Sequence, residues 1–369
     1  MRRIGIFQLY SPFGLIEEYI DNLLDSMKSI VEKLMIVCNS SIADIELQKL
    51  LRHTDTILKR KNEGYDAGAY KDILLKQDKT FWDDWDEIVF FNCTFYGPFF
   101  PWTIIFEQMN KKNVDFWGLS RNPGNRRMRK DGKIAPEHLQ SYFVVVRKNM
   151  FSSSCFWQFW IELKYPQNYY EAVEDFEWHF TSYFKEKGFK YTSWLDVQGY
   201  NPMLFEEVDP SFYPYELLRD YKFPVIKCKS MSLVNFEQME KAINYLKNNT
   251  DYDIGLVTDH IKHLNSKNMW KPFSIQTLEK FVNTHAKIYI FGNGRYGKGI
   301  ERYFQFREWK YVAHVVSHPR HNNEVSLEDL KLCKKDGLIV ALGNVALKEV
   351  EEKLTEKFNQ DQILFPDLN

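Results

Sequence analysis

Two short segments of this chain concentrate glycine, amide and carboxylate groups. The first, residues 62–70, reads Asn-Glu-Gly-Tyr-Asp-Ala-Gly-Ala-Tyr. Its glycines let the backbone approach a ligand closely, and its polar side chains can hold ribose hydroxyls. The second, residues 86–98, is an apolar run that ends abruptly in the polar Asn92, Cys93 and Thr94. Taken singly, each segment also fits an ordinary turn or a buried strand; together and in this order, they indicate a pocket for a nucleotide sugar.

The chain around these segments alternates strand with helix. Short apolar runs predict strands and apolar residues at helical spacing predict helices, in the order strand 4–9, helix 15–33, strand 34–38, helix 42–51 and strand 56–58. This rhythm is typical of a doubly wound, mainly parallel α/β sheet, which binds ligands beyond the carboxyl ends of its strands. Asn39, the turn at 62–68 and residues 92–94 all fall on that predicted edge.

Beyond the second segment, the pattern predicts a helix at 102–109 and a strand at 114–119, followed by a basic stretch from Arg121 to Lys133. That stretch fits a solvated loop, or else a flap that neutralises a departing diphosphate or meets anionic lipid head groups. Residues 138–148 predict a further strand that faces the pocket and is opened by His138.

Carboxylates gather at the start of a predicted helix that begins near Glu171 and ends at Gly188. Acidic side chains in a first helical turn often only complement the helix dipole. The alternative is that one of them, Asp175 or Glu177, faces the pocket as a catalytic base.

The last part of the chain indicates a second, smaller α/β domain. Residues 287–300 read as a strand, a Gly-x-Gly-x-x-Gly turn and a helix start, which is the Rossmann-like pattern. The glycines serve either close packing of helix on strand or the binding of a nucleotide or phosphate. Ser317 and His318 replace the acidic residue expected after the second strand, so support for dinucleotide binding is weak. We expect three parts, at 1–232, at 233–284 as a helical linker, and at 285–369 as the Rossmann-like domain.

Composition places the chain among globular proteins. Its 369 residues exceed the usual single core, charged residues make up 27% and the net charge is -1. Such a balance lacks the basic field of a nucleic-acid binder, so we expect no nucleic-acid partner. The five cysteines are scattered without a Cys-x-x-Cys pair, which fits a reducing compartment and no zinc site. Because the first residues enter a strand-like run without a signal-peptide pattern, we expect a cytoplasmic protein.

Over residues 1 to 232, the chain resembles the rhamnan synthesis protein F family, glycosyltransferases that build rhamnose-containing bacterial surface polysaccharides. The matching segments are 62–71, 91–98, 115–119, 138–148, 177–188 and 223–227. The resemblance implies a GT-A-like domain that transfers a sugar from a nucleotide-sugar donor, typically L-rhamnose from dTDP-L-rhamnose. It also implies a glycan acceptor, lipid-linked, and peripheral contact with the inner face of the membrane.

One residue departs from the pattern of this family. The family commonly has Asp in the second position of an Asn-Asp-Ser element, where this chain has Cys93 between Asn92 and Thr94. Because a hard divalent cation prefers carboxylate oxygens to a thiol, Cys93 argues against dependence on Mg²⁺ or Mn²⁺. Positive groups such as the basic stretch would then stabilise the departing diphosphate. Alternatively, Asp66 would help to hold a cation.

These residues support a hypothesis of single displacement. An acceptor hydroxyl, deprotonated by a carboxylate, attacks the anomeric carbon and inverts it as the nucleoside diphosphate leaves. Glu177, at the matched family position, is the first choice for the base, and Asp175 is the second. His138 is a substrate ligand or a third choice. The residues expected to hold the donor are Asn39, Asn62, Gly64, Asp66, Asn92, Thr94, His138 and Gln140, and none is assigned to a metal.

Two other classes of protein stay open. With the metal-binding Asp missing, the chain could bind nucleotide sugars or assemble with partners in polysaccharide synthesis without turnover. The turn at 292–297 could instead serve an NAD-dependent oxidoreductase. Release of a nucleoside diphosphate from a sugar donor separates a transferase from a binding protein, and saturable nicotinamide binding would favour the oxidoreductase. The sequence sets neither the donor sugar nor the oligomeric state.

Overall fold

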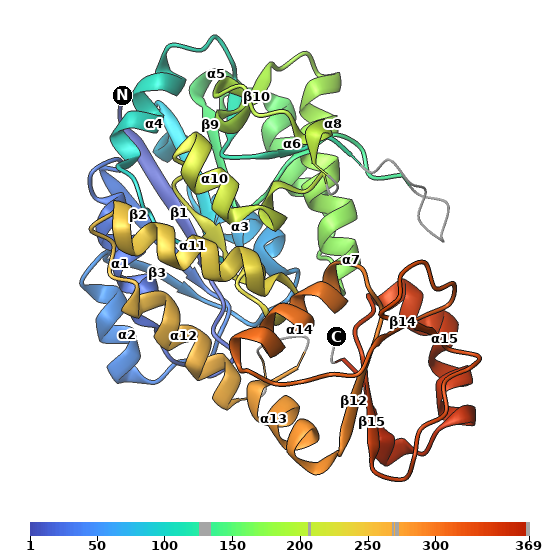
Figure 1. Cartoon of the computed structure of the whole chain (residues 1–369). Helices are drawn as coiled ribbons and strands as arrows, with labels where there is room; N and C mark the ends of the chain where they lie inside the picture. The colour runs from blue at the N-terminus through green and yellow to red at the C-terminus, as the bar shows by residue number, and fades with distance from the viewer. Residues whose placement is uncertain (125–133, 206–207, 268, 270–272, 367–369) are drawn as a thin grey trace. The chain divides into compact units, whose positions relative to one another are not determined.

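The chain forms two compact units in a computed structural model (Figure 1). The structure describes residues 1–369 except 125–133, 206–207, 268, 270–272 and 367–369. The first unit holds Met1–Lys227 with Thr250–Tyr252, and the second holds Cys228–Asn249 with Asp253–Asn369. The helical segment expected as a separate linker therefore falls almost wholly within the second unit.

A seven-stranded sheet forms the first unit, in the order β10-β6-β9-β4-β1-β2-β3. Its strands are β1 (Arg3–Leu9), β2 (Lys33–Cys38), β3 (Thr56–Lys59), β4 (Glu87–Asn92), β6 (Phe116–Gly118), β9 (Phe143–Arg147) and β10 (Tyr191–Ser193). Every pairing is parallel except those of β9, which runs antiparallel to both β4 and β6. The predicted fold class, a doubly wound and mainly parallel α/β sheet, is confirmed.

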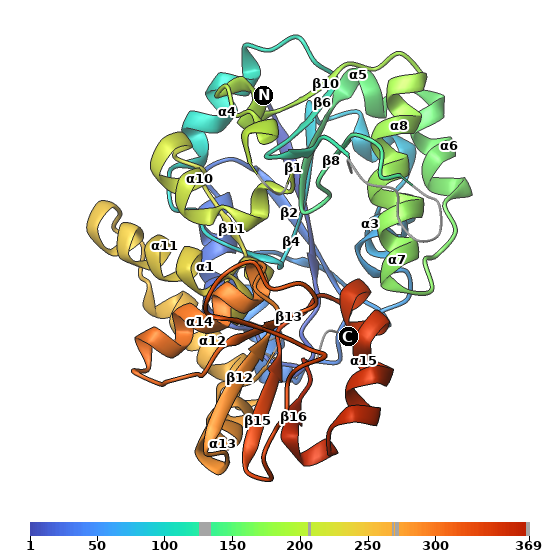
Figure 2. The same cartoon turned by 45° about the vertical axis from the view of Figure 1, so that its right-hand side comes forward.

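Helices cover both faces of this sheet. They are α1 (Glu18–Met27), α2 (Asp44–Leu51), α3 (Tyr65–Lys76), α4 (Trp102–Asn110), α6 (Ser154–Glu162), α8 (His179–Glu186) and α10 (Pro214–Tyr221). Figure 2 shows α3, α6 and α8 on one side of the strands, with α4 and α10 on the other. Within the described part of the chain, no helix is both long and apolar enough to cross a bilayer.

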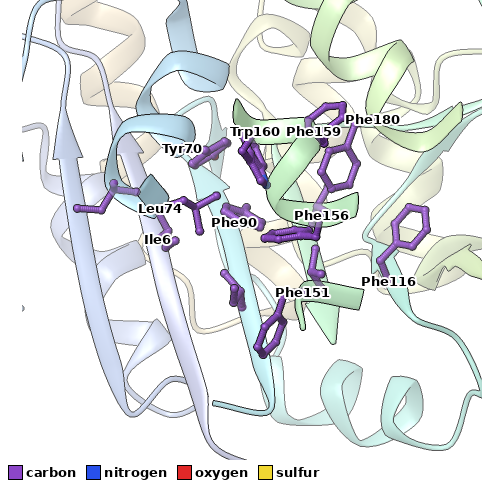
Figure 3. Packing of buried hydrophobic residues seen from close by; sticks show 14 of the residues in the cluster. Ile6, Tyr70, Leu74, Phe90, Phe116, Phe151, Phe156, Phe159, Trp160 and Phe180 are labelled. Atoms are coloured by element: carbon purple, nitrogen blue, oxygen red, sulfur yellow. The ribbon is translucent and has the colours of Figure 1, made fainter. Parts of the chain in front are cut away.

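Aromatic side chains fill the layer between the sheet and the helices α3, α6 and α8 (Figure 3). Tyr70 and Phe90 meet there at a centroid distance of 5.0 Å, and Phe90 lies 5.8 Å from Trp160. Phe91, the next residue of β4, packs instead against Phe7 at 4.9 Å. Because β4 is buried on both faces, its sequence is a continuous apolar run rather than an alternating one.

Two predicted elements differ in the structure. The strand expected over 138–148 is broken by a turn into β8 (His138–Leu139) and β9, and β8 pairs with the short β7 (Arg121–Asn122). The helix expected from Glu171 begins earlier, with α7 (Tyr169–Glu171), and continues as a π-helical segment, η2 (Ala172–Trp178), before α8. Glu177 therefore lies beyond the first helical turn, and complementing the helix dipole no longer accounts for it.

The second unit is built on a five-stranded parallel sheet in the order β14-β13-β12-β15-β16. Its strands are β12 (Lys287–Phe291), β13 (His314–Val316), β14 (Glu324–Ser326), β15 (Asp336–Val340) and β16 (Ile363–Leu364). Its helices are α11 (Phe236–Asn249), α12 (Gly255–Ser266), α13 (Ile275–Thr284), α14 (Arg295–Phe306) and α15 (Asn344–Lys357).

The glycine pattern of this second unit has a packing role. A Cβ on Gly297 would lie 2.0 Å from the carbonyl oxygen of Gly292, so only glycine lets α14 sit so close to the end of β12. Nucleotide binding by this turn stays a prediction.

The buried Tyr70 provides a test of the aromatic layer. Its side chain is 0% exposed, and none of the described residues hydrogen-bonds its hydroxyl. Since an unpaired buried hydroxyl costs about 1–3 kcal/mol, we expect Tyr70→Phe to keep or raise the free energy of unfolding in urea. Tyr70→Ala should lose about 3–5 kcal/mol by opening a cavity. A loss above about 1 kcal/mol in Tyr70→Phe would show that the hydroxyl is bonded after all.

Candidate functional site

A tight turn carries α3 onto the carboxyl edge of the first sheet. Gly64 (φ 73) and Tyr65 (φ 54) both adopt the left-handed conformation, which costs least at glycine. Asn39, directly after β2, donates from Nδ2 to Asn62 Oδ1 at 3.0 Å and to the carbonyl of Tyr65 at 2.9 Å. The side-chain amide of Asn39, expected to hold the nucleotide, is therefore engaged in holding the turn.

Arg60 is a second anchor of this turn, and the sequence pattern did not single it out. Its guanidinium donates to Asn39 Oδ1 at 3.2 Å and to the carbonyl of Glu63 at 2.7 Å. It also pairs with Asp72 at 2.7 Å and lies over the ring of Tyr165. Arg60 thus holds Glu63 directly, and it also holds Asn39, which bonds Asn62 and Tyr65.

Gly68 sets how closely α3 approaches the turn. A Cβ on Gly68 would lie 2.4 Å from the carbonyl oxygen of Glu63, which is closer than any real contact. The backbone of α3 therefore packs directly on the turn. This packing brings the first residues of α3, including Asp66, against the end of β4.

Asp66 faces the ends of two other chain segments. Its Oδ1 accepts from the amide of Ala67 at 2.9 Å. Its Oδ2 lies 3.4 Å from Asn92 Nδ2 and 3.4 Å from Ser141 Oγ. Asp66 and Asn92, both predicted for the pocket, are thus brought together, whereas Ser141 was missed because it lies in the turn that interrupts the expected strand.

Glu177 is the second carboxylate of this cluster. Its Oε2 accepts from the amide of Ser141 at 2.8 Å and from Ser141 Oγ at 2.6 Å. Its Oε1 lies 3.4 Å from Nε2 of His138. The other ring nitrogen of His138, Nδ1, donates to the carbonyl of Pro136 at 2.7 Å, which fixes the ring. Residues predicted from three separate segments therefore meet around Ser141.

The two carboxylates differ in proton affinity. Burial and the negative charge of Glu177 raise the pKa of Asp66 to about 6. Burial also opposes the ionisation of Glu177, but the hydrogen bond from His138 and the positive charge of Lys227 lower its pKa to about 2. Lys227, which also lies over the ring of Tyr142, ends the matched segment 223–227, but the sequence assigned it no role in the site.

Gln140, expected to hold the donor, lies in a separate buried network. Its Oε1 accepts from Ser120 Oγ at 2.6 Å, and its Nε2 donates to Asp209 Oδ1 at 3.1 Å. The hydroxyl of Tyr142 lies 2.7 Å from the same Ser120 Oγ. Both ends of the Gln140 amide are occupied by these protein groups.

At the polar end of β4, Asn92 and Thr94 hydrogen-bond to each other. Asn92 Oδ1 accepts from the amide of Thr94 at 3.1 Å and from its hydroxyl at 2.7 Å. The thiol of Cys93 is buried against the backbone of Tyr10, with the amide at 3.4 Å and the carbonyl at 3.5 Å. Burial raises the pKa of Cys93 to about 11, so the sulfur stays protonated at neutral pH.

These contacts test whether a divalent cation fits at Cys93. A hard cation needs several oxygen ligands, whereas the protonated thiol faces Tyr10 and the Asn92 amide directs its Nδ2 at Asp66. Among the residues the structure describes, no three His, Cys, Asp or Glu side chains are grouped to hold a metal ion. The end of β4 thus presents a protonated thiol where a carboxylate was expected. Independence of a divalent cation stays a prediction, as does the alternative that Asp66 helps to hold one.

The remaining predicted residues are placed as follows. Asp175, the second choice for the base, is exposed, as are Asn62 and Thr94. Of the basic stretch, 125–133 lies outside the described residues, and Arg121 pairs with Asp196 at 2.8 Å and Glu137 at 2.5 Å. The charge of Arg121 is thus balanced within the protein.

A small cavity lies beside the cluster. Its volume is about 10 Å³, and its walls include Ser141, Glu177, Tyr70 and Trp160. That space holds no more than about one water molecule, so a sugar does not fit inside this cavity.

Comparison with known proteins relates the chain to a family. The family model described as Rhamnan synthesis protein F matches residues 34–291. The uncharacterized protein y4gN of Sinorhizobium fredii is 24% identical over 193 residues, which cover 52% of this chain and 48% of that protein. The chain therefore spans about half the length of this curated relative.

Solved structures show weaker likenesses. 4-Diphosphocytidyl-2C-methyl-D-erythritol synthase from Anaerococcus prevotii is 11% identical, with a TM-score of 0.34 over 52% of this chain and 86% of that one. Glucosyl-3-phosphoglycerate synthase from Mycobacterium tuberculosis, in complex with Mn²⁺ and UDP-glucose, is 15% identical, with a TM-score of 0.27 over 41% of this chain and 59% of that one. Scores this low carry no inference for this chain.

The close approach at Gly68 can be tested by adding one methyl group. Alanine normally favours a helix interior by about 1 kcal/mol over glycine. Because the new Cβ would collide with the Glu63 carbonyl, we expect Gly68→Ala to lose about 1–3 kcal/mol in urea denaturation. Gly294→Ala is the control, since a Cβ there meets nothing within 4 Å. Equal stability of Gly68→Ala and the wild type would contradict the packing described.

The raised pKa of Asp66 gives a pH-dependent prediction. Because that pKa rises from 3.8 to about 6, the wild type loses stability relative to an uncharged variant as the pH rises through 6. We expect the free energy of unfolding of Asp66→Asn, relative to that of the wild type, to rise by on the order of 1 kcal/mol between about pH 5 and pH 8. Urea denaturation at both pH values measures this gain. The same difference at both pH values would mean that the pKa of Asp66 is not shifted.

Proposed function

The chain belongs to the rhamnan synthesis protein F family, and from that premise we propose that it is a GT-A-like glycosyltransferase acting on a nucleotide-sugar donor. One observation carries the proposal. At the carboxyl edge of the first sheet, Asp66, Asn92 and Glu177 converge around Ser141, all within the matched region. Ligands of open α/β sheets bind at such an edge.

The donor we propose is dTDP-L-rhamnose, and the acceptor is a growing, lipid-linked glycan of a bacterial surface polysaccharide. Family membership supports both. The sugar transfer would take place in the cytoplasm, with peripheral contact at the membrane face where such an acceptor is presented.

The reaction we propose is an inverting single displacement. The O–H bond of the acceptor breaks as a carboxylate takes its proton, and the oxygen forms a bond to the anomeric carbon. The bond from that carbon to the diphosphate breaks, and its electron pair leaves with the nucleoside diphosphate. Gly64, Asn92 and Thr94 would border the donor, and Lys227 would supply positive charge near the reacting groups.

A second candidate is a protein of polysaccharide synthesis that binds nucleotide sugars without turning them over. The state of Cys93 favours it, because a protonated thiol directed at Tyr10 stands where the family commonly has a carboxylate.

Donor binding and turnover separate these candidates. With the full chain, we expect dTDP-rhamnose at about 100 times its Kd to stabilise the fold by about 2.7 kcal/mol, with or without chelator. With a glycan acceptor, dTDP should be released. Stabilisation without release from any sugar donor would favour the binding protein. Neither stabilisation nor release with any nucleotide sugar would contradict both candidates.

A further inference from the structure

The cluster contains two carboxylates, and their hydrogen bonds assign them different tasks. We propose that Asp66, and not Glu177, takes the proton from the acceptor, with Ser141 and Glu177 as positioning residues. This inference rests on the proposed transferase function and specifies which group performs its proton transfer.

Glu177 has little capacity left to act as a base. One oxygen already accepts two hydrogen bonds from Ser141, at 2.8 and 2.6 Å, and the other faces His138 at 3.4 Å. A carboxylate stabilised as an anion in this way, with its pKa lowered to about 2, binds an additional proton weakly. These contacts instead suit a group that fixes the turn before β9.

Asp66 has the opposite arrangement. Its Oδ1 is held by the amide of Ala67 at 2.9 Å, but its Oδ2 has two long contacts, both at 3.4 Å, with Asn92 and Ser141. That oxygen therefore keeps a lone pair available at the carboxyl edge, where ligands of open α/β sheets bind.

The surroundings of Asp66 favour a base that works near neutral pH. The titratable groups acting on it are Glu177 from η2, Tyr70 from α3 and Cys93 after β4. Tyr70 and Cys93 stay neutral because burial raises the pKa of each, so Glu177 is the charged neighbour among these groups. His138 and Lys227 act on Glu177 and keep it ionised. With a pKa of about 6, Asp66 is ionised at pH 7 and still holds a proton better than an ordinary carboxylate.

Ser141 can stabilise Asp66 after it has taken the proton. Its hydroxyl hydrogen is directed at Glu177, at 2.6 Å, which leaves a lone pair of its oxygen to face Asp66. Once the acceptor proton has moved to Asp66 Oδ2, the new O–H can donate to Ser141 Oγ. The proton then passes to solvent, and the carboxylate is restored.

The first part of the test is the pH profile of nucleoside diphosphate release by the full chain. We expect the wild-type kcat to fall below about pH 6, and Asp66→Asn to lose kcat by about 100-fold or more with little change in the donor KM. Glu177→Gln and Ser141→Ala should keep measurable kcat. In Glu177→Gln, the fall of kcat on the acid side should move to lower pH, because the charge that raises the pKa of Asp66 is gone. Asp78→Asn, an exposed site, is the matched control.

The second part needs no turnover. Carboxyl ¹³C NMR of the full chain, with the Asp66 signal assigned through Asp66→Asn, should give a midpoint near 6 that falls in Glu177→Gln. A midpoint near 4 in the wild type, or an Asp66→Asn variant that keeps its kcat while Glu177→Gln loses about 100-fold, overturns the assignment of the base alone. A midpoint near 6 with no release from any sugar donor overturns the transferase function, and the base with it.

Discussion

The candidate site depends on one close contact, the packing of the α3 backbone at Gly68 onto the carbonyl of Glu63. Because no side chain separates the helix from the turn before it, Asp66 reaches the end of β4 and lies 3.4 Å from Asn92. Arg60 and Asn39 hold that turn through hydrogen bonds to the carbonyls of Glu63 and Tyr65. A larger residue at position 68 would push α3 outward and separate the carboxylate of Asp66 from Asn92 at the end of β4.

This geometry makes two nearby carboxylates unequal. Two like charges in one partly buried site cannot both ionise at their ordinary pKa, and their hydrogen bonds decide which of them yields. Ser141, His138 and Lys227 all favour the anion of Glu177. Asp66 accepts weaker hydrogen bonds, so the repulsion between the two charges raises the pKa of Asp66 rather than that of Glu177. The break between β8 and β9 and the π-helical segment η2 are the local irregularities that allow Ser141 and Glu177 to meet, and such π-helical turns occur often at functional sites.

The sequence predicted the sheet well because apolar periodicity and the strand–helix rhythm are local properties. It also placed Asn39, Asp66 and Asn92 on one edge, since parallel strands align their carboxyl ends. What the sequence could not reveal depends on partners distant in the chain: Ser141 bridges Asp66 and Glu177, and Lys227 acts on Glu177. Nor could residue type alone tell whether an amide binds a ligand or the protein itself, and the amides of Asn39 and Gln140 turn out to bind the protein.

A structure of the full chain bound to a non-reactive dTDP-sugar analogue would show directly whether the sugar is transferred at the carboxyl edge beside Asp66. We predict that the sugar lies at the end of β4, with the face of its anomeric carbon opposite the diphosphate open toward Asp66 Oδ2. A nucleotide bound instead at the turn around Gly292 to Gly297, with the edge beside Asp66 empty, would contradict it.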